Sequence, residues 1–191
     1  MSPANTSATG GYLAPIPPDP LEGKELLRFI QQWIVGLTGL DGKMVRPRWQ
    51  PEPPNIPSAG EVWAAIGITA RPSDTFPYVS GPELQRHELL NVLTSFYDLG
   101  SGGQADAMAA RLRDGSAVPQ NREVLTKNNF ALIEVGEIIT LPSLLKQRWL
   151  YRVDLNVLLR REIVRTYAVL DLVSAQVSLD GNDISINPES E

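Results

Sequence analysis

The chain has 191 residues, of which 42% are hydrophobic and 20% charged, a composition that fits one globular domain with tails at its ends. Its formal net charge of −5 argues against general affinity for nucleic acid, which needs a basic face. The absence of cysteine excludes disulfides and most structural zinc sites and suits assembly in a reducing cytoplasm, and no segment approaches the roughly 20 apolar residues that would cross a membrane.

Both ends of the chain lack the pattern of a core element. Residues 1–21 are rich in Pro, Ser, Thr and Gly and predict an extended arm, without the apolar run of a signal peptide. Residues 180–191 are polar and acidic and predict a tail. We expect both ends to be disordered in isolation and ordered by neighbouring chains, or alternatively to fold back on their own subunit. Residues 22–179 between them are predicted to form a single domain.

The first half of this domain predicts a helix followed by strands. Apolar residues at amphipathic spacing indicate a helix at residues 22–37, ended by a cluster of glycines. A short strand at residues 44–49 is stopped by prolines. Alternating apolar residues predict strands at residues 62–70 and 86–97.

The second half predicts helices and then further strands. Ser101 is a plausible cap for a helix with a narrow stripe of alanine, methionine and leucine, and Pro119 opens a second short helix. Strands are predicted at residues 130–140, 147–160 and 171–179. The order of elements predicts an α+β fold, with an antiparallel sheet of about four to six strands and helices packed against it.

The sequence offers no constellation of catalytic or metal-binding residues. His87 is the single histidine, and no motif surrounds it. Glu134 and Glu137 are three apart on a predicted strand and therefore point to opposite faces. The glycines at residues 100–103 lack both the Walker A pattern and the dinucleotide fingerprint. We therefore predict no catalytic, cofactor-binding or metal site, and no enzyme.

Arginines gather on the predicted strand that begins at residue 147. Arg161 and Arg165 share one face, and Arg148, Arg152 and Arg160 have the opposite parity. Three interpretations stay open. The arginines form a solvated strand face, they make ion pairs between subunits, or they contact DNA, although the acidic remainder of the chain would oppose the last.

Four segments of the sequence, in order, resemble the phage neck or tail terminator family. They are VRPRWQP at residues 45–51 with the prolines after it; FYD at 96–98 with the glycine-rich turn and alanine-rich helix; LRDG at 112–115 with PQNRE at 119–123; and GEI at 136–138, which leads to RWL at 148–150, RVD at 152–154, LRR at 159–161 and LVSA at 172–175. The resemblance covers residues 24–179, and its strength lies in the order and spacing of these segments.

The resemblance implies a structural virion protein at the head–tail junction, made in the host cytoplasm. Such subunits form closed rings, usually hexamers, that terminate the tail tube and join it to the neck. The implied partners are further copies of the chain, the tail tube protein and the head–tail connector proteins, with DNA only as cargo in the lumen and with no membrane or cofactor. The alternatives are a head-side connector or baseplate subunit, and a small intracellular enzyme with a site around His87 and Arg86.

A closed ring needs two different complementary patches on each subunit. The proline-rich loop at residues 50–60 and the long hairpin connection at residues 71–83 are the predicted contact segments, because exposed loops of this kind reach partners. The candidate interface residues are Trp49, Pro53, Pro54, Phe76, Tyr78, Arg160, Arg161 and Arg165.

Overall fold

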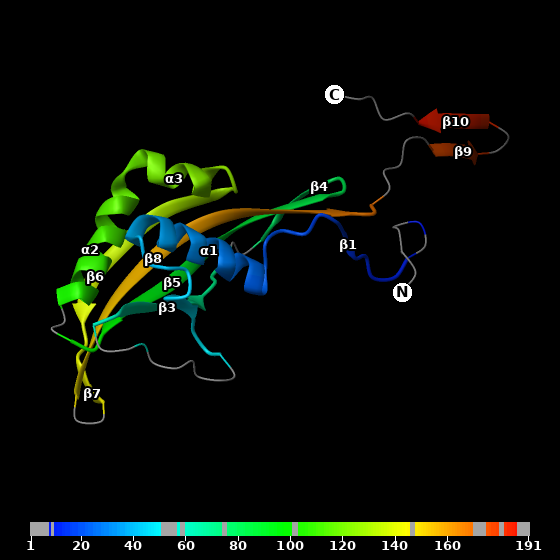
Figure 1. Cartoon of the computed structure of the whole chain (residues 1–191). Coiled ribbons are helices and arrows are strands. Elements are labelled where there is room, and N and C mark those ends of the chain that lie inside the picture. The colour runs from blue at the N-terminus through cyan, green and yellow to red at the C-terminus, as the bar shows by residue number, and fades with distance from the viewer. Residues whose placement is uncertain are drawn as a thin grey trace. The chain divides into compact units, whose positions relative to one another are not determined.

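The computed structural model shows an α+β fold in which helices pack on a mostly antiparallel sheet (Figure 1). It describes residues 8, 10–50, 57, 60–73, 76–100, 103–145, 148–169, 175–179 and 182–186. The main elements are, in chain order, α1 (Gly23–Thr38), β2 (Val45–Pro47), β3 (Val62–Ala70), β5 (Glu83–Asp98), α2 (Gly103–Ala117), α3 (Pro119–Thr126), β6 (Phe130–Thr140) and β8 (Arg148–Tyr167). The shorter strands are β1 (Pro15–Ile16), β4 (Tyr78–Ser80), β7 (Ser143–Leu145), β9 (Ala175–Leu179) and β10 (Asn182–Ile186). The α+β prediction is confirmed.

The chain divides into two compact units. The core unit consists of Pro20–Phe76 and Arg86–Ile163, and the terminal unit consists of Met1–Asp19, Pro77–Gln85 and Val164–Glu191. The core unit holds α1, α2, α3 and the hydrophobic core. The long strands β5 and β8 each contribute residues to both units.

Helix α1 forms because its apolar residues recur on one face. Leu26 and Ile30 on that face are fully buried. The helix ends at Gly39, which has a φ of 73° and donates its N–H to the carbonyl oxygen of Val35 at 2.9 Å. This left-handed cap strongly favours glycine, which has no Cβ. The helix predicted at residues 22–37 is confirmed to within one residue at each end.

The sheet of the core unit has the strand order β2, β3, β5, β8, and β6 pairs with β8. β2 runs parallel to β3, whereas β3–β5 and β6–β8 are antiparallel. The alternation of β5 buries Leu90, Val92 and Phe96 completely, as predicted. Leu89 and Leu93 alternate with these residues and are half-buried. β5 therefore places apolar residues toward both faces of the sheet.

Helices α2 and α3 also pack in the core unit and contact β6. The predicted stripe of α2 is confirmed, since Ala105, Ala109 and Leu112 are fully buried. Pro119 stands in the first turn of α3, where its missing N–H removes no intrahelical bond. Indole Nε1 of Trp33 donates a hydrogen bond to the backbone carbonyl oxygen of Asn121 at 2.9 Å and so links α1 to α3.

The connection predicted at residues 71–83 is more regular than expected. Within it β4 pairs with the start of β5 around Gly81, whose φ is 53°. Further back, Ser73 forms an isolated bridge with Glu88. Short strands such as β1, β4 and β7 raise the number of strands above the expected four to six. The sequence did not reveal them because strands of two or three residues show no periodicity.

The last strands also differ from the prediction. β8 continues to Tyr167, well past the expected end at residue 160. β9 and β10 form an antiparallel hairpin of their own, and β10 lies in the segment expected to be a polar tail.

Part of the N-terminal arm folds onto its own chain within the terminal unit. Pro15 and Ile16 pair with Tyr167 and Thr166 at the end of β8. The carboxylate of Asp19 forms an ion pair with the guanidinium of Arg165 at a distance of 2.6 Å. For this part of the arm the structure agrees with the alternative that the arm folds back on its own subunit.

Candidate interaction surface

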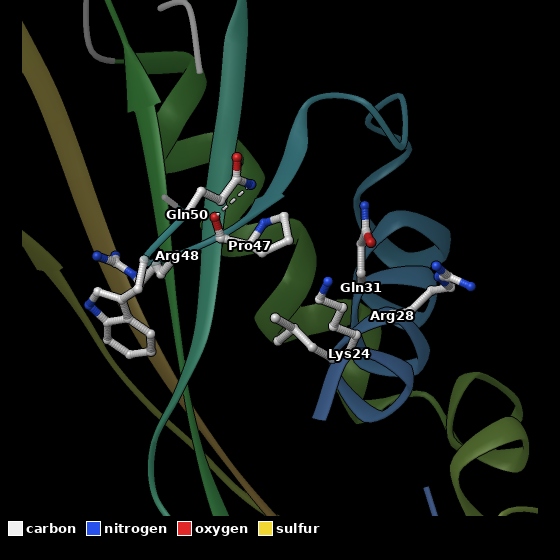
Figure 2. A pocket seen from close by; sticks show the side chains of 8 residues that line it. Lys24, Arg28, Gln31, Pro47, Arg48 and Gln50 are labelled. Atoms are coloured by element: carbon white, nitrogen blue, oxygen red, sulfur yellow. Dashed lines mark hydrogen bonds between the residues drawn. The ribbon is translucent and has the colours of Figure 1, made fainter. Parts of the chain in front are cut away.

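A groove of about 760 Å³ lies beside the first half of α1, where residues 47–50 run past the helix (Figure 2). We call it the Trp49 groove. Its lining residues are Lys24, Leu27, Arg28, Gln31, Pro47, Arg48, Trp49 and Gln50. Side chains from α1 form one wall, and the chain that leaves β2 forms the other. The described lining residues combine apolar and cationic side chains, and none of them carries a carboxylate.

Trp49 is held in an unusual conformation for such a large exposed side chain. Its φ is 56°, in the left-handed region that costs a residue with a Cβ about 1–2 kcal/mol. Its side chain is nevertheless 72% exposed. The indole lies over Gly67 of β3, where an added Cβ would come within 2.7 Å of the ring. Backbone strain at an exposed aromatic residue is typical of a functional position.

Arg48 fixes the chain immediately before this tryptophan. Its backbone N–H donates to the carbonyl oxygen of Ile66 at 2.7 Å. Its guanidinium donates to the hydroxyl of Ser95, which in turn donates to the carboxylate of Asp154. Asp154 also accepts two hydrogen bonds from Arg152, at 2.8 and 2.7 Å, and this contact, opposed by burial, raises the pKa of Arg152. A series of hydrogen bonds between side chains therefore connects this wall of the groove to β5 and β8.

The cations on the α1 side of the groove lack a counterion among the residues that the structure describes. Lys24 and Arg28 are exposed, and neither makes an ion pair with any residue that the structure describes. Gln31 next to them donates hydrogen bonds to the carbonyl oxygens of Gly42 and Val45 at 2.9 and 2.7 Å. These two hydrogen bonds link α1 to the loop that leads into β2 and to β2 itself. The groove thus offers uncompensated positive charge beside an exposed indole.

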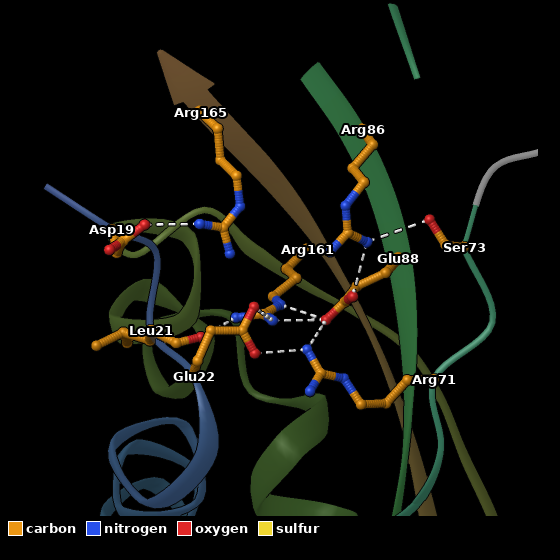
Figure 3. A network of polar contacts seen from close by, with 9 residues as sticks. All are labelled: Asp19, Leu21, Glu22, Arg71, Ser73, Arg86, Glu88, Arg161 and Arg165. Carbon is orange, nitrogen blue, oxygen red and sulfur yellow. Dashed lines mark hydrogen bonds and ion pairs between the residues drawn. The ribbon is translucent and has the colours of Figure 1, made fainter. Parts of the chain in front are cut away.

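A second polar cluster of the core unit is built around Glu88 of β5 (Figure 3). The Glu88 side chain is 3% exposed and accepts hydrogen bonds from Arg71 at 2.8 Å, Arg86 at 2.9 Å and Arg161 at 2.7 Å. Arg161 is 2% exposed and also pairs with Glu22 at 3.0 Å. We call these five residues the Glu88 network.

Every charged group of the Glu88 network has a partner of opposite charge inside the chain. Burial alone raises the pKa of Glu88, but hydrogen bonds from the three arginines outweigh it, so the net effect lowers that pKa. Burial lowers the pKa of Arg71, yet its contacts with Glu22 and Glu88 prevail and raise it. A buried pair of this kind costs several kcal/mol to break, on the order of 3–5. The network ties the segment before α1 to β5 and β8.

The structure places the predicted interface residues in different environments. Trp49, Phe76 and Tyr78 are 72%, 86% and 66% exposed. Arg160 is also exposed and lines a shallow cavity with His87. Pro53 and Pro54 lie outside the described residues.

The other two arginines of the predicted set have partners within the chain. Arg161 is buried in the Glu88 network, so its guanidinium serves the subunit's own fold. Arg165 pairs with Asp19. These pairings were not predictable from the sequence, because the carboxylates involved are far away along the chain.

An exposed apolar pair at the start of β8 was not among the predicted residues. Leu144 of β7 and Trp149 of β8 are register partners and are 64% and 56% exposed. The alternation of β8 placed Trp149 in the same series as the inward residues Val153 and Leu155. The tryptophan precedes the buried part of the strand, and only the length of the hairpin explains its exposure.

No group of three or more His, Asp or Glu side chains able to hold a metal ion occurs among the described residues. Glu134 and Glu137 are both exposed, and the register of β6 shifts beside each of them. None of the described helices is long and apolar enough to span a membrane.

The chain was compared with sequence models of known protein families and with curated proteins. Residues 24–183 match the sequence model of a family described as phage neck terminator protein. No curated protein sequence matches the chain significantly. The matched range includes the core unit from the start of α1, both walls of the Trp49 groove and most of the Glu88 network.

Proposed function

Because the chain belongs to the phage neck terminator family, we propose that it forms a closed ring at the head–tail junction of the virion. The ring terminates the tail tube and joins it to the neck. Its partners are further copies of the chain, usually six in such rings, together with the tail tube protein and the head–tail connector proteins. DNA passes through the lumen as cargo.

The distribution of exposed apolar side chains supports an assembly role. Trp49 stands at its groove, Tyr78 and Val79 lie on the β4 hairpin, and Leu144 and Trp149 lie on the β7–β8 hairpin, each more than half exposed. A ring closes through a heterologous interface, in which two different patches of each subunit meet. The subunit offers several distinct patches, enough for a contact on each side and for contacts with other neck proteins.

The proposed mechanism is geometric. A ring seated on the last layer of the tail tube covers the surface to which the next tube subunit would add. Its opposite face then presents a new surface to the connector. This task needs stable, specific interfaces and no reactive centre, and interfaces of about 800 Å² on each partner are typical for stable complexes.

The observation that carries the proposal is the family match over residues 24–183. The test is electron cryomicroscopy of virions that carry this chain with an affinity label, compared with particles assembled without the chain. We expect labelled density in a ring at the junction, and unjoined heads and tails when the chain is missing. Density at the baseplate, inside the head or nowhere in the virion would overturn the proposal, as would normal particles without the chain.

A further inference from the structure

We propose that the Trp49 groove binds the acidic C-terminal segment, residues 180–191, of a second copy of this chain. The inference rests on the proposed ring and specifies one of its subunit contacts. The groove supplies Lys24, Arg28 and Trp49, and the segment supplies carboxylates on both sides of a stretch with apolar residues.

Charge complementarity selects this partner. The chain as a whole is acidic, with a formal net charge of −5, whereas the charged residues described in the lining of this groove are Lys24, Arg28 and Arg48, all of them cations. Arg48 is partly engaged by Ser95, whereas Lys24 and Arg28 pair with no described residue. Lys24 and Arg28 therefore fit a carboxylate ligand.

The C-terminal sequence has the opposite character. No lysine or arginine follows Arg165, while acidic residues occur at Asp180, Asp183, Glu189 and Glu191. Ile184, Ile186 and Pro188 stand between them. A segment of this composition brings carboxylates to the cations and apolar side chains to the indole of Trp49, which matches both halves of the groove.

The segment also needs a surface to pack on. β9 and β10 pair with each other and with no other strand among the described residues. An isolated two-stranded hairpin is marginally stable in water. Docking against another subunit would supply the missing contacts.

The β7–β8 hairpin is a poorer occupant on electrostatic grounds. Its sequence contains Lys146, Arg148 and Arg152 around the exposed Trp149, so it would bring further cations to a cationic groove. Like charges brought together at an interface cost binding energy. The acidic segment is the one favoured by the charges on both sides.

A complementation experiment tests whether the contact joins two copies. One full-length variant carries a charge-reversed groove, Lys24→Glu with Arg28→Glu. The other carries a neutralised segment, Asp180→Asn, Asp183→Asn, Glu189→Gln and Glu191→Gln. Each keeps one functional half, so we expect each alone to associate at least tenfold more weakly than the unmodified chain. An equimolar mixture should form pairs, measured by light scattering at low ionic strength.

The reversed groove is expected to fold normally, because Lys24 and Arg28 are exposed and a glutamate near the start of α1 interacts favourably with the helix dipole. Arg111→Glu on the exposed side of α2 makes the same kind of charge change outside the groove and should leave association unchanged. Association of both groove and segment variants at the level of the unmodified chain would overturn the proposal. A mixture that stays unpaired would show that any contact lies within one chain, and would also overturn it.

A peptide titration separates this inference from the proposed ring. A fluorescent peptide with the sequence of residues 175–191 is added to the full-length chain with the neutralised segment. We expect saturable binding that weakens at least tenfold with the reversed groove and is retained with Arg111→Glu. Absence of binding, or equal binding to the reversed groove, overturns the inference even if rings occupy the neck. Binding together with virions that show no ring overturns the proposed function instead.

Discussion

Two clusters of the core unit use arginine in opposite ways. In the Glu88 network, Arg161 is 2% exposed and every buried charge has a partner of opposite sign. In the Trp49 groove, Lys24 and Arg28 are exposed, and no described residue neutralises them. The first cluster fixes how the chain enters α1 and packs on β5, whereas the second leaves positive charge for a ligand from outside.

The difference shows that the number of basic residues does not mark an interface. Burial makes an unpaired charge so costly that a buried arginine acquires carboxylates during folding. An exposed cation is stabilised by water and has no such requirement, so its charge stays available for a partner. The predictions below test whether the two clusters are separable, with one controlling stability and the other association.

The largest effect is expected for Glu88→Gln. The substitution keeps the shape but removes the charge shared by Arg71, Arg86 and Arg161, which leaves Glu22 as the one carboxylate paired with the buried Arg161 among the described residues. We expect a loss of about 3–5 kcal/mol of unfolding free energy, measured by urea denaturation. Glu25→Gln in the exposed first turn of α1 is the control and should cost less than about 1 kcal/mol. Equal effects of the two substitutions would show that the network is not the stabilising centre.

The same network predicts how stability responds to acid. The folded-state pKa of Glu88 is lowered, so its contribution is complete above the unfolded-state pKa of roughly 4.3 and is lost as the pH falls through the folded value. The stability difference between the unmodified chain and Glu88→Gln should therefore be constant near neutral pH and shrink below about pH 4. Urea denaturation from pH 7 to pH 3 measures it. If the stability difference between the two proteins grew as the pH falls, the result would contradict a lowered pKa of Glu88.

Trp49→Gly should affect association far more than stability. Glycine relieves the left-handed backbone at φ 56°, and little burial is lost because the side chain is 72% exposed. We expect the unfolding free energy to change by less than about 1 kcal/mol. Self-association should weaken by roughly 30-fold, which corresponds to about 2 kcal/mol for an interface tryptophan.

Trp149→Gly is the matched control for the effect on stability, because it removes an equally large, exposed indole from an ordinary strand. It should lower stability by about 1 kcal/mol through the flexibility of glycine. If Trp49→Gly instead destabilises the fold and leaves association intact, the Trp49 groove serves the stability of the fold, as the Glu88 network does, and does not serve association.

The smallest effect is expected for Arg71→Gln. The Arg71 side chain is 37% exposed, and Arg86 and Arg161 still neutralise Glu88 after its removal. Water screens its contribution, so we expect a loss of about 1 kcal/mol or less in urea denaturation. A loss as large as that of Glu88→Gln would show that the network acts as one indivisible unit.

Most of the regular elements were predictable because they follow short-range rules. β3 and β6 occupy the residues expected from their alternation, and α1 and α3 begin and end close to their sequence signals. The short strands β4 and β7 were not predicted, since partners across a turn define them. The fate of individual arginines was also hidden, because the carboxylate nearest Arg161 belongs to Glu88 on another strand.

The sequence alone determined the α+β class, the amphipathic faces of α1 and β5, and the resemblance to the neck terminator family. Each of these depends on the order of residue types along the chain. The tertiary structure decided which charged residues stabilise the fold and which stay available to partners. It buried Arg161 between Glu22 and Glu88, placed the ring of Trp49 over Gly67 and left Lys24 and Arg28 without an ion-pair partner among the described residues. Charge pairing depends on distance in space, and the chain order does not encode that distance.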